Sequence, residues 1–165
     1  MRARLLACLL GVLASATVAC GDAEDPGAAL SLELGTGSWR FEALEDGQEV
    51  ELVRGAQGGW HVWVSFRVRG MAEERAIATL RIQPADESRP ANEADVQLRL
   101  GGSNDEGYRH YIGWTGIVPD PACLVGELVR LEATMEAPDG TLLRSERDVT
   151  LLGGTYPPGA CDQGR

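Results

Sequence analysis

The sequence predicts an all-β fold, a single antiparallel β-sandwich of about eight strands, and three observations support it. Apolar and polar residues alternate at a period of two in several segments, turn residues recur at intervals of 8 to 15 residues, and no segment shows a convincing amphipathic helix. Alternation at this period puts the apolar side chains of a strand on one face, which two packed sheets can bury between them.

The clearest strand extends from Trp60 to Val68. Because successive side chains of a strand point to opposite faces, this segment has one apolar face, which we expect in the core, and one mixed face, which we expect to meet solvent. The residues of the apolar face are Trp60, Val62, Val64, Phe66 and Val68. Those of the mixed face are His61, Trp63, Ser65 and Arg67.

Further strands are expected before and after this one, separated by segments rich in glycine, proline and acidic residues. Asp46-Gly47 suits a tight hairpin turn, so the strands on its two sides are expected to pair. A second hairpin is expected at Pro138-Asp139-Gly140, with Glu136 opposite Thr141. The predicted strands are Leu30 to Leu34, Trp39 to Leu44, Glu49 to Val53, Ala76 to Gln83, Asp95 to Leu100, Tyr108 to Val118, Gly126 to Glu136 and Thr141 to Leu152.

The N-terminus has the layout of an export signal. Arg2 and Arg4 precede an apolar stretch of about 14 residues, from Leu5 to Val18, and Ala19 follows it. A helix needs roughly 20 apolar residues to cross a bilayer, so this stretch is too short for a permanent span and fits a cleaved signal. We therefore predict that residues 1–19 are a signal peptide that is removed.

The segment Thr17-Val18-Ala19-Cys20 resembles the lipobox of bacterial lipoproteins, in which the cysteine takes a diacylglycerol before the signal is cut off. Thr17 departs from the family pattern, which usually has leucine or another aliphatic residue there. The resemblance implies a lipidated Cys20 that attaches the protein to a membrane. The acidic residues and turn formers that follow predict a tether over residues 20–28, and the alternating strands after it predict a β-sandwich domain over residues 29–165. Gly21 replaces the aspartate that retains some lipoproteins at the inner membrane, so the resemblance implies the periplasmic or surface face of the outer membrane.

The four cysteines favour lipidation over an ordinary secretory signal cut near Ala19. Cys8 lies inside the predicted signal, and Cys123 and Cys161 can form a disulfide in an oxidising compartment. Cys20 would then be an odd thiol unless the lipid consumes it.

The last predicted hairpin resembles the closing strands of bacterial Ig-like or fibronectin-III-like modules. The resemblance rests on Leu128 to Thr134 and Arg147 to Leu151, covers about 30 residues and implies an Ig-like sandwich. The tryptophan and buried disulfide of antibody domains are missing from the pattern. The segment Gly58 to Trp63 also looks like a pattern found in predicted lipoproteins of large-genome bacteria.

The charge of the chain argues against nucleic acid as a partner. Removal of the signal takes away Arg2 and Arg4 from the 15 basic residues and leaves all 25 acidic ones, so the mature formal charge is 13 minus 25, or −12. Such a protein repels phosphate backbones and anionic lipid surfaces.

Two sets of side chains on separate strands form a candidate binding surface for a protein or glycan partner. If the two strands are neighbours, their aromatic and arginine side chains would make an exposed platform, since these residue types dominate binding hot spots. The alternative is cross-strand packing that only stabilises the sheet. The platform residues are His61, Trp63, Arg67, Tyr108, His110 and Trp114.

No catalytic residue, metal site or cofactor is predicted, and we expect a non-enzymatic binding or structural module. The two histidines, His61 and His110, lack metal-ligand spacing, and no Gly-x-Ser-x-Gly turn is present. Two alternatives stay open. One is a small envelope enzyme that acts on glycans through paired carboxylates, and the other is a calcium-dependent adhesion module that uses the loops at Asn104 to Glu106 and Asp86-Glu87.

Overall fold

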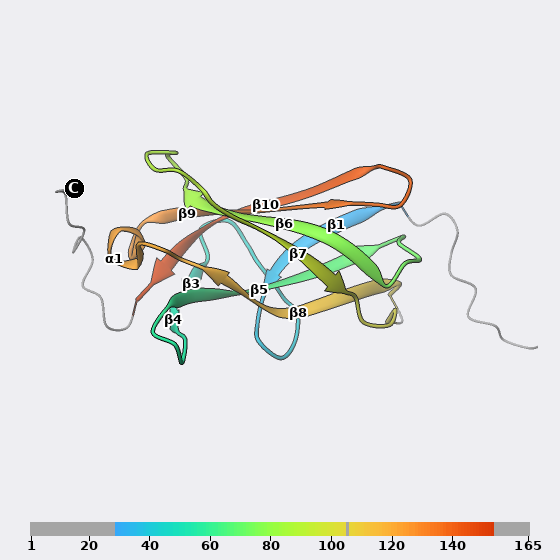
Figure 1. The fold of residues 1–165 in the computed structure, drawn as a ribbon, viewed down its shortest axis with the longest axis horizontal. Helices are drawn as coiled ribbons and strands as arrows, with labels where there is room; N and C mark the ends of the chain where they lie inside the picture. Colours follow the sequence, from blue (N-terminus) through green and yellow to red (C-terminus); the bar gives the residue numbers. More distant parts are fainter. Residues whose placement is uncertain (1–28, 105, 154–165) are drawn as a thin grey trace, which may run out of the picture.

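The computed structural model describes residues 29–104 and 106–153, and it confirms an all-β fold of two sheets (Figure 1). The predicted signal peptide, Cys20, the tether and Cys161 lie outside the described residues, so the predictions for them stay predictions. In the part of the chain that is described, no helix is long and apolar enough to cross a membrane.

The first sheet is built around β5, its central strand. Strands β1 and β4 pair with different halves of one edge of β5, and β8 pairs with the other edge. All pairs in this sheet are antiparallel. Its strands are β1 (Ser31–Thr36), β2 (Glu42–Ala43), β4 (Val53–Arg54), β5 (Trp60–Arg69) and β8 (Tyr108–Ile117).

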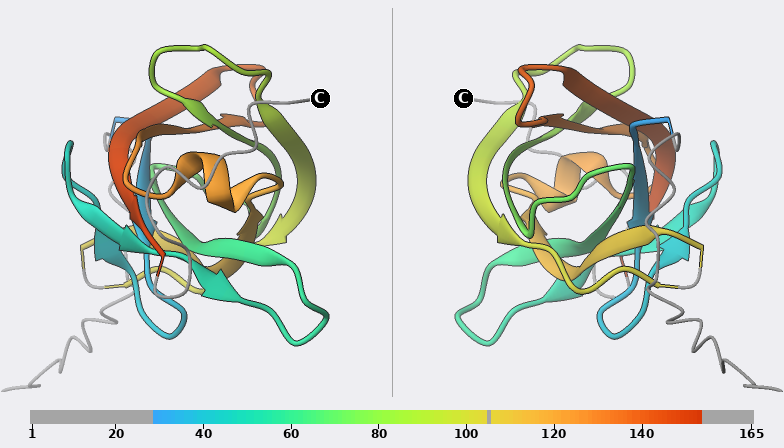
Figure 2. Two further views of the ribbon diagram at one scale, coloured as in Figure 1. Left: turned by 90° about the vertical axis from the view of Figure 1, so that its left-hand side faces the viewer. Right: turned by 90° about the vertical axis from the view of Figure 1, so that its right-hand side faces the viewer.

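The second sheet has the order β3-β10-β9-β6-β7 and curls around the core like half a barrel (Figure 2). Its edge strand β3 runs parallel to β10, so the prediction of a wholly antiparallel sandwich is wrong for this pair. The short helix α1 (Pro121–Leu124) lies across one open end, where Leu124 is buried (Figure 2). The strands are β3 (Glu49–Glu51), β6 (Arg75–Pro84), β7 (Asn92–Arg99), β9 (Leu128–Glu136) and β10 (Leu142–Leu152).

The parallel pair arises because Asp46-Gly47 turns the chain without making the predicted hairpin. The N–H of Gly47 donates to the carbonyl of Asp148 at 2.6 Å, and the Oδ1 of Asp46 accepts from the N–H of Asp148 at 3.1 Å. The turn is thereby attached to β10, so the chain passes from the first sheet to the second. The other predicted hairpin, at Pro138 to Gly140, is confirmed, but its register is not the predicted one, because Glu136 lies opposite Leu142 and not opposite Thr141.

The apolar face of β5 forms the centre of the core, as predicted. Val62, Val64, Phe66 and Val68 are completely buried, whereas Trp60 is half-buried and packs at the rim. On the opposite face, His61 and Ser65, which we expected to meet solvent, are buried. The facing residues of the second sheet include Val129, Leu131, Ala133, Val149 and Leu151.

A buried hydrogen bond joins the two sheets where β1 approaches β10. The backbone N–H of Leu34 donates to the Oγ of Ser145 at 3.0 Å, and both residues are buried. A buried N–H without an acceptor is costly, so this serine hydroxyl satisfies a group that faces away from β5.

Replacing Ser145 tests this link. Ser145→Ala should lower the free energy of unfolding by about 1–3 kcal/mol, because the N–H of Leu34 would stay buried without its acceptor. Urea denaturation would measure the change. Ser103→Ala, at an exposed serine, is the control and should change stability by less than about 0.5 kcal/mol. Equal stability of the two variants would contradict the role of the link.

Candidate functional site

Strands β5 and β8 are neighbours, so the condition for an aromatic platform on the first sheet is met. Arg67 lies opposite His110, and Arg69 lies opposite Tyr108. Directly opposed residues of two strands point to the same side of the sheet. Tyr108 and His110 therefore share the outer face with Arg67, as predicted.

A β-bulge removes Trp114 from this face. Phe66 lies opposite Tyr111 and Val64 opposite Trp114, so two residues of β8 face one residue of β5 between these pairs. The additional residue reverses the alternation of side chains along β8. Trp114 is thus opposite the buried Val64, with its ring 5.6 Å from that of Phe66. The expected placement of Trp114 beside Tyr108 and His110 is wrong.

The bulge also anchors a loop across the outer face of β5. This loop, residues 37–41, lies over Ser65, whose hydroxyl donates to the carbonyl of Gly37 at 2.9 Å. The same hydroxyl accepts from the N–H of Gly113 in the bulge at 3.1 Å. Gly113 has φ +80°, and a Cβ there would lie 3.0 Å from the carbonyl oxygen of Ser38, so a glycine suits the site on both counts. The loop buries Ser65 completely and divides the face into two parts.

The first part is an ionic and aromatic cluster around Arg67. The guanidinium donates to the Oε2 of Glu33 through Nε at 2.9 Å and Nη2 at 2.7 Å. Its Cζ lies 4.8 Å from the ring centroid of Phe41 and 4.5 Å from that of Tyr108. The hydroxyl of Tyr108 donates to the Oε1 of Glu33 at 3.0 Å. We call this set, with His110 beside Phe41, the Arg67 cluster.

Most of the polar groups in the Arg67 cluster already have partners within it. The hydrogen bond to Glu33 raises the pKa of Arg67 above its ordinary value, so the guanidinium stays charged. Burial, and then the positive charge of Arg67, lower the pKa of His110. The cluster fits the alternative in which cross-strand packing stabilises the sheet.

The second part of the face contains His61 and Trp63. Their rings meet edge to face, with centroids 4.8 Å apart, and His61 is only 6% exposed. Burial lowers the pKa of His61, and its Nε2 has no hydrogen-bond partner among the described residues. His61 is therefore a neutral, buried support for Trp63 at neutral pH.

Trp63 lines a groove of about 660 Å³, which we call the Trp39 groove. Trp39, in the 37–41 loop, is 92% exposed at its margin. One wall comes from the loop and β2, and the other comes from β3 and the start of β4. The charged residues in its lining are Arg40, Glu42, Glu49 and Glu51, of which Arg40 pairs with Glu42 at 2.8 Å.

Sequence reasoning missed the contribution of Trp39, which we had placed at the start of a strand. The preceding Gly35-Thr36-Gly37-Ser38 is rich in loop-forming residues and could have indicated an exposed loop. No local signal places Glu49 and Glu51 beside Trp39, because their position depends on the pairing of β3 with β10.

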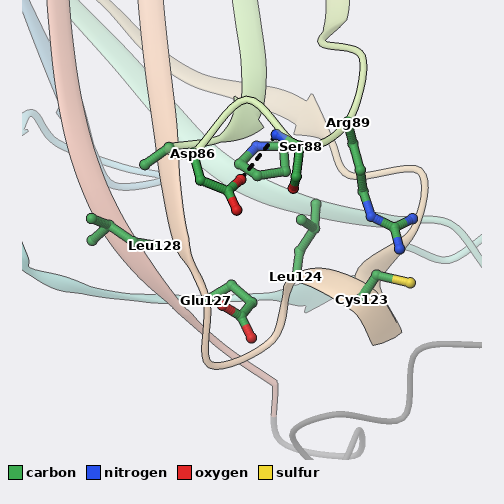
Figure 3. Close-up of a pocket in the computed structure, with 9 residues that line it drawn as sticks. Asp86, Ser88, Arg89, Cys123, Leu124, Glu127 and Leu128 are labelled. Carbon is green, nitrogen blue, oxygen red and sulfur yellow. Dashed lines mark hydrogen bonds between the residues drawn. The ribbon is translucent and has the colours of Figure 1, made fainter. Parts of the chain in front are cut away.

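A second hollow, of about 340 Å³, lies between the loop after β6 and the segment from α1 to β9 (Figure 3). Asp86 and Glu127 line it, but the Oδ1 of Asp86 accepts from the N–H of Ser88 at 3.0 Å. Hydrogen bonds from Ser88 lower the pKa of Asp86, whereas the general acid of a glycosidase needs a raised one. The pair therefore gives no support to the enzyme alternative. Cys123 also lines this hollow.

The loops considered for calcium use their side-chain oxygens locally. The Oδ1 of Asn104 accepts from the N–H groups of Glu106 and Tyr108, at 3.1 and 2.9 Å. Asp105 lies outside the described residues. Within residues 29–104 and 106–153, no group of three or more His, Cys, Asp or Glu side chains is arranged to hold a metal ion.

No protein-family model matches the chain, and a comparison with curated proteins finds no match.

The different positions of the tryptophans should appear in stability measurements. Trp114→Ala should lower the free energy of unfolding by about 2–4 kcal/mol, because it removes a ring that packs on Phe66. Trp39→Ala should change it by less than about 0.5 kcal/mol, because Trp39 is exposed. Urea denaturation of the two variants would test this, and a larger loss for Trp39→Ala would show that Trp39 is a packing residue.

The acid sensitivity of folding should depend in part on His61. Its pKa in the folded state is below the ordinary 6.5, so the unfolded chain takes up a proton more readily. The contribution of neutral His61 to the free energy of unfolding should be fully present above pH 6.5. It should be lost as the pH drops from 6.5 towards the folded-state pKa. Denaturation at neutral and mildly acidic pH should show a smaller loss for His61→Phe, with His110 accounting for part of the remainder. An identical loss would mean that His61 is protonated without cost.

Proposed function

We propose that the protein is a lipid-anchored, non-enzymatic binding module of the cell envelope, which holds a protein or glycan partner in the Trp39 groove. The observation that carries this proposal is the exposure of Trp39, at 92%, beside a groove that Trp63 also lines. Tryptophan is among the residues most enriched in binding hot spots, because a large rigid ring buries much area when a partner covers it.

The support beneath Trp39 favours a binding role. The 37–41 loop is attached at Gly37 to the buried hydroxyl of Ser65, and Thr36 donates to the carbonyl of Trp63 at 2.8 Å. A loop fixed to a sheet by such contacts has little backbone freedom left to lose on binding.

The outer face of the second sheet has a different character. Glu132 lies between Arg81 and Arg144, at 3.6 and 3.2 Å, and Arg81 also contacts Glu93 at 3.4 Å. This row of alternating charges crosses four neighbouring strands and is suited to contact with water. This difference between the outer faces of the two sheets favours the first sheet as the side that meets a partner.

The proposed anchor would leave the groove accessible. The chain enters the domain at Ser31, and the groove begins at Thr36, at the other end of β1. Five steps along a strand span about 17 Å, so the tether of the proposed anchor would join the domain at the end of β1 that is farther from the groove. The Cys123–Cys161 disulfide is a further part of the proposal. The resemblance of β9 and β10 to Ig-like modules is another, and the regular pairing of this hairpin supports it.

Site-directed cross-linking in cells that produce the protein would test the function. A photo-reactive amino acid at position 40, beside Trp39 in the lining of the groove, should give a discrete cross-linked product, because this position would lie against the partner. The same amino acid at position 146, on the charged face of the second sheet, should give none.

Alanine variants provide a matched control. In the chain that carries the photo-reactive amino acid at position 40, Trp39→Ala should abolish capture of the product, whereas Leu142→Ala, at a 67% exposed residue of the second sheet, should retain it. Capture that survives Trp39→Ala, or that is equal from positions 40 and 146, would refute the proposed function.

A further inference from the structure

The geometry points to a particular class of partner for the Trp39 groove: an extended peptide segment that carries arginine or lysine and adds as a strand to the open edge of β3. This inference rests on the proposed function and specifies the ligand of the same groove. It follows from the backbone of β3, from the charges of the lining and from its two tryptophans.

The backbone of β3 has an unpaired edge that faces the groove. The carbonyl of Gln48 accepts from Thr150 at 2.9 Å, and the N–H of Leu52 donates to Leu152 at 2.7 Å, so even-numbered residues bond to β10. Because backbone groups alternate in direction along a strand, those of Glu49 and Glu51 point the other way. Among the described residues β3 has no second strand partner, and both glutamates line the groove. An extended peptide can pair with such an edge.

The charges of the lining select a cationic peptide. Three glutamates and one arginine line the groove, and that arginine is already paired with Glu42. His61, behind Trp63, adds no positive charge at neutral pH because burial lowers its pKa. Opposite charges across an interface steer encounter and exclude partners of the wrong sign, so an anionic ligand is disfavoured.

The tryptophans provide faces on which a cationic side chain can rest. A guanidinium or ammonium group is attracted to the face of an aromatic ring, and tryptophan is the strongest such partner. The Arg67 cluster shows the same chemistry within this molecule, where one guanidinium contacts two rings and a carboxylate. The Trp39 groove offers two rings and carboxylates of this kind to an incoming side chain.

Binding of synthetic peptides to the purified protein would test the inference. The probe is a set of short, fluorescently labelled peptides in which arginine alternates with threonine, with matched peptides that carry glutamate or glutamine in place of arginine. The arginine peptides should bind, the glutamate peptides should not, and added salt should weaken binding because the charges involved are exposed. Methylation of the backbone nitrogens that face β3 should weaken binding by about fivefold for each hydrogen bond lost.

Variants of the protein locate the contact. Glu49→Gln and Glu51→Gln should each weaken binding of the arginine peptide by roughly two- to fivefold, as expected for exposed ion pairs. Trp39→Ala should weaken it by about tenfold. Glu146→Gln, which removes an exposed carboxylate of the second sheet, should leave affinity unchanged.

The outcomes separate this inference from the proposed function. If neutral or glutamate peptides or a neutral oligosaccharide bind as well as the arginine peptides, or if backbone methylation has no effect, the cationic strand is wrong. Failure of the arginine peptides to bind likewise overturns it. The proposed function survives these results as long as Trp39→Ala still abolishes capture of the cross-linked partner, and it fails if capture persists.

Discussion

The arrangement of the outer face depends on one buried hydroxyl, that of Ser65. It donates to the carbonyl of Gly37 and accepts from the N–H of Gly113, so it joins the 37–41 loop to the bulge in β8. Burial of a polar group is tolerated only when its hydrogen bonds are made, and here both are made to backbone groups. The loop position, and with it the position of Trp39, follows from this contact.

The 37–41 loop separates side chains that are already paired with one another from side chains that are exposed to a partner. On one side, Arg67 is bound to Glu33 and packed between the rings of Phe41 and Tyr108, so it has little left to offer a partner. On the other side, Trp39 is exposed and the edge of β3 is unpaired among the described residues. Interaction sites are built from groups that gain contacts when a partner arrives, which is why we propose the Trp39 groove as the site.

Local patterns predicted the long strands well but could not predict how they are joined. The alternation in Trp60 to Val68 identified the core face of β5, because burial of one face imposes a period of two. Asp46-Gly47 correctly predicted a turn, but it did not predict that the strand after the turn pairs with β10. That pairing depends on a contact with Asp148, which is 102 residues away in sequence. The bulge at Gly113 reversed the predicted face of Trp114, and the shift depends on pairing with β5. Of the six predicted platform residues, only Trp63 lines the Trp39 groove.

Native-state hydrogen exchange of Ser65→Ala tests the central claim most directly, which is that the serine hydroxyl holds the loop and its tryptophan in place. The account predicts that the amide of Gly113 is protected in the natural chain and loses that protection in the variant, while the amides that pair β5 with β8 elsewhere stay protected. Unchanged protection at Gly113 in the variant would show that the bulge keeps its structure without the Ser65 hydroxyl and would contradict the account.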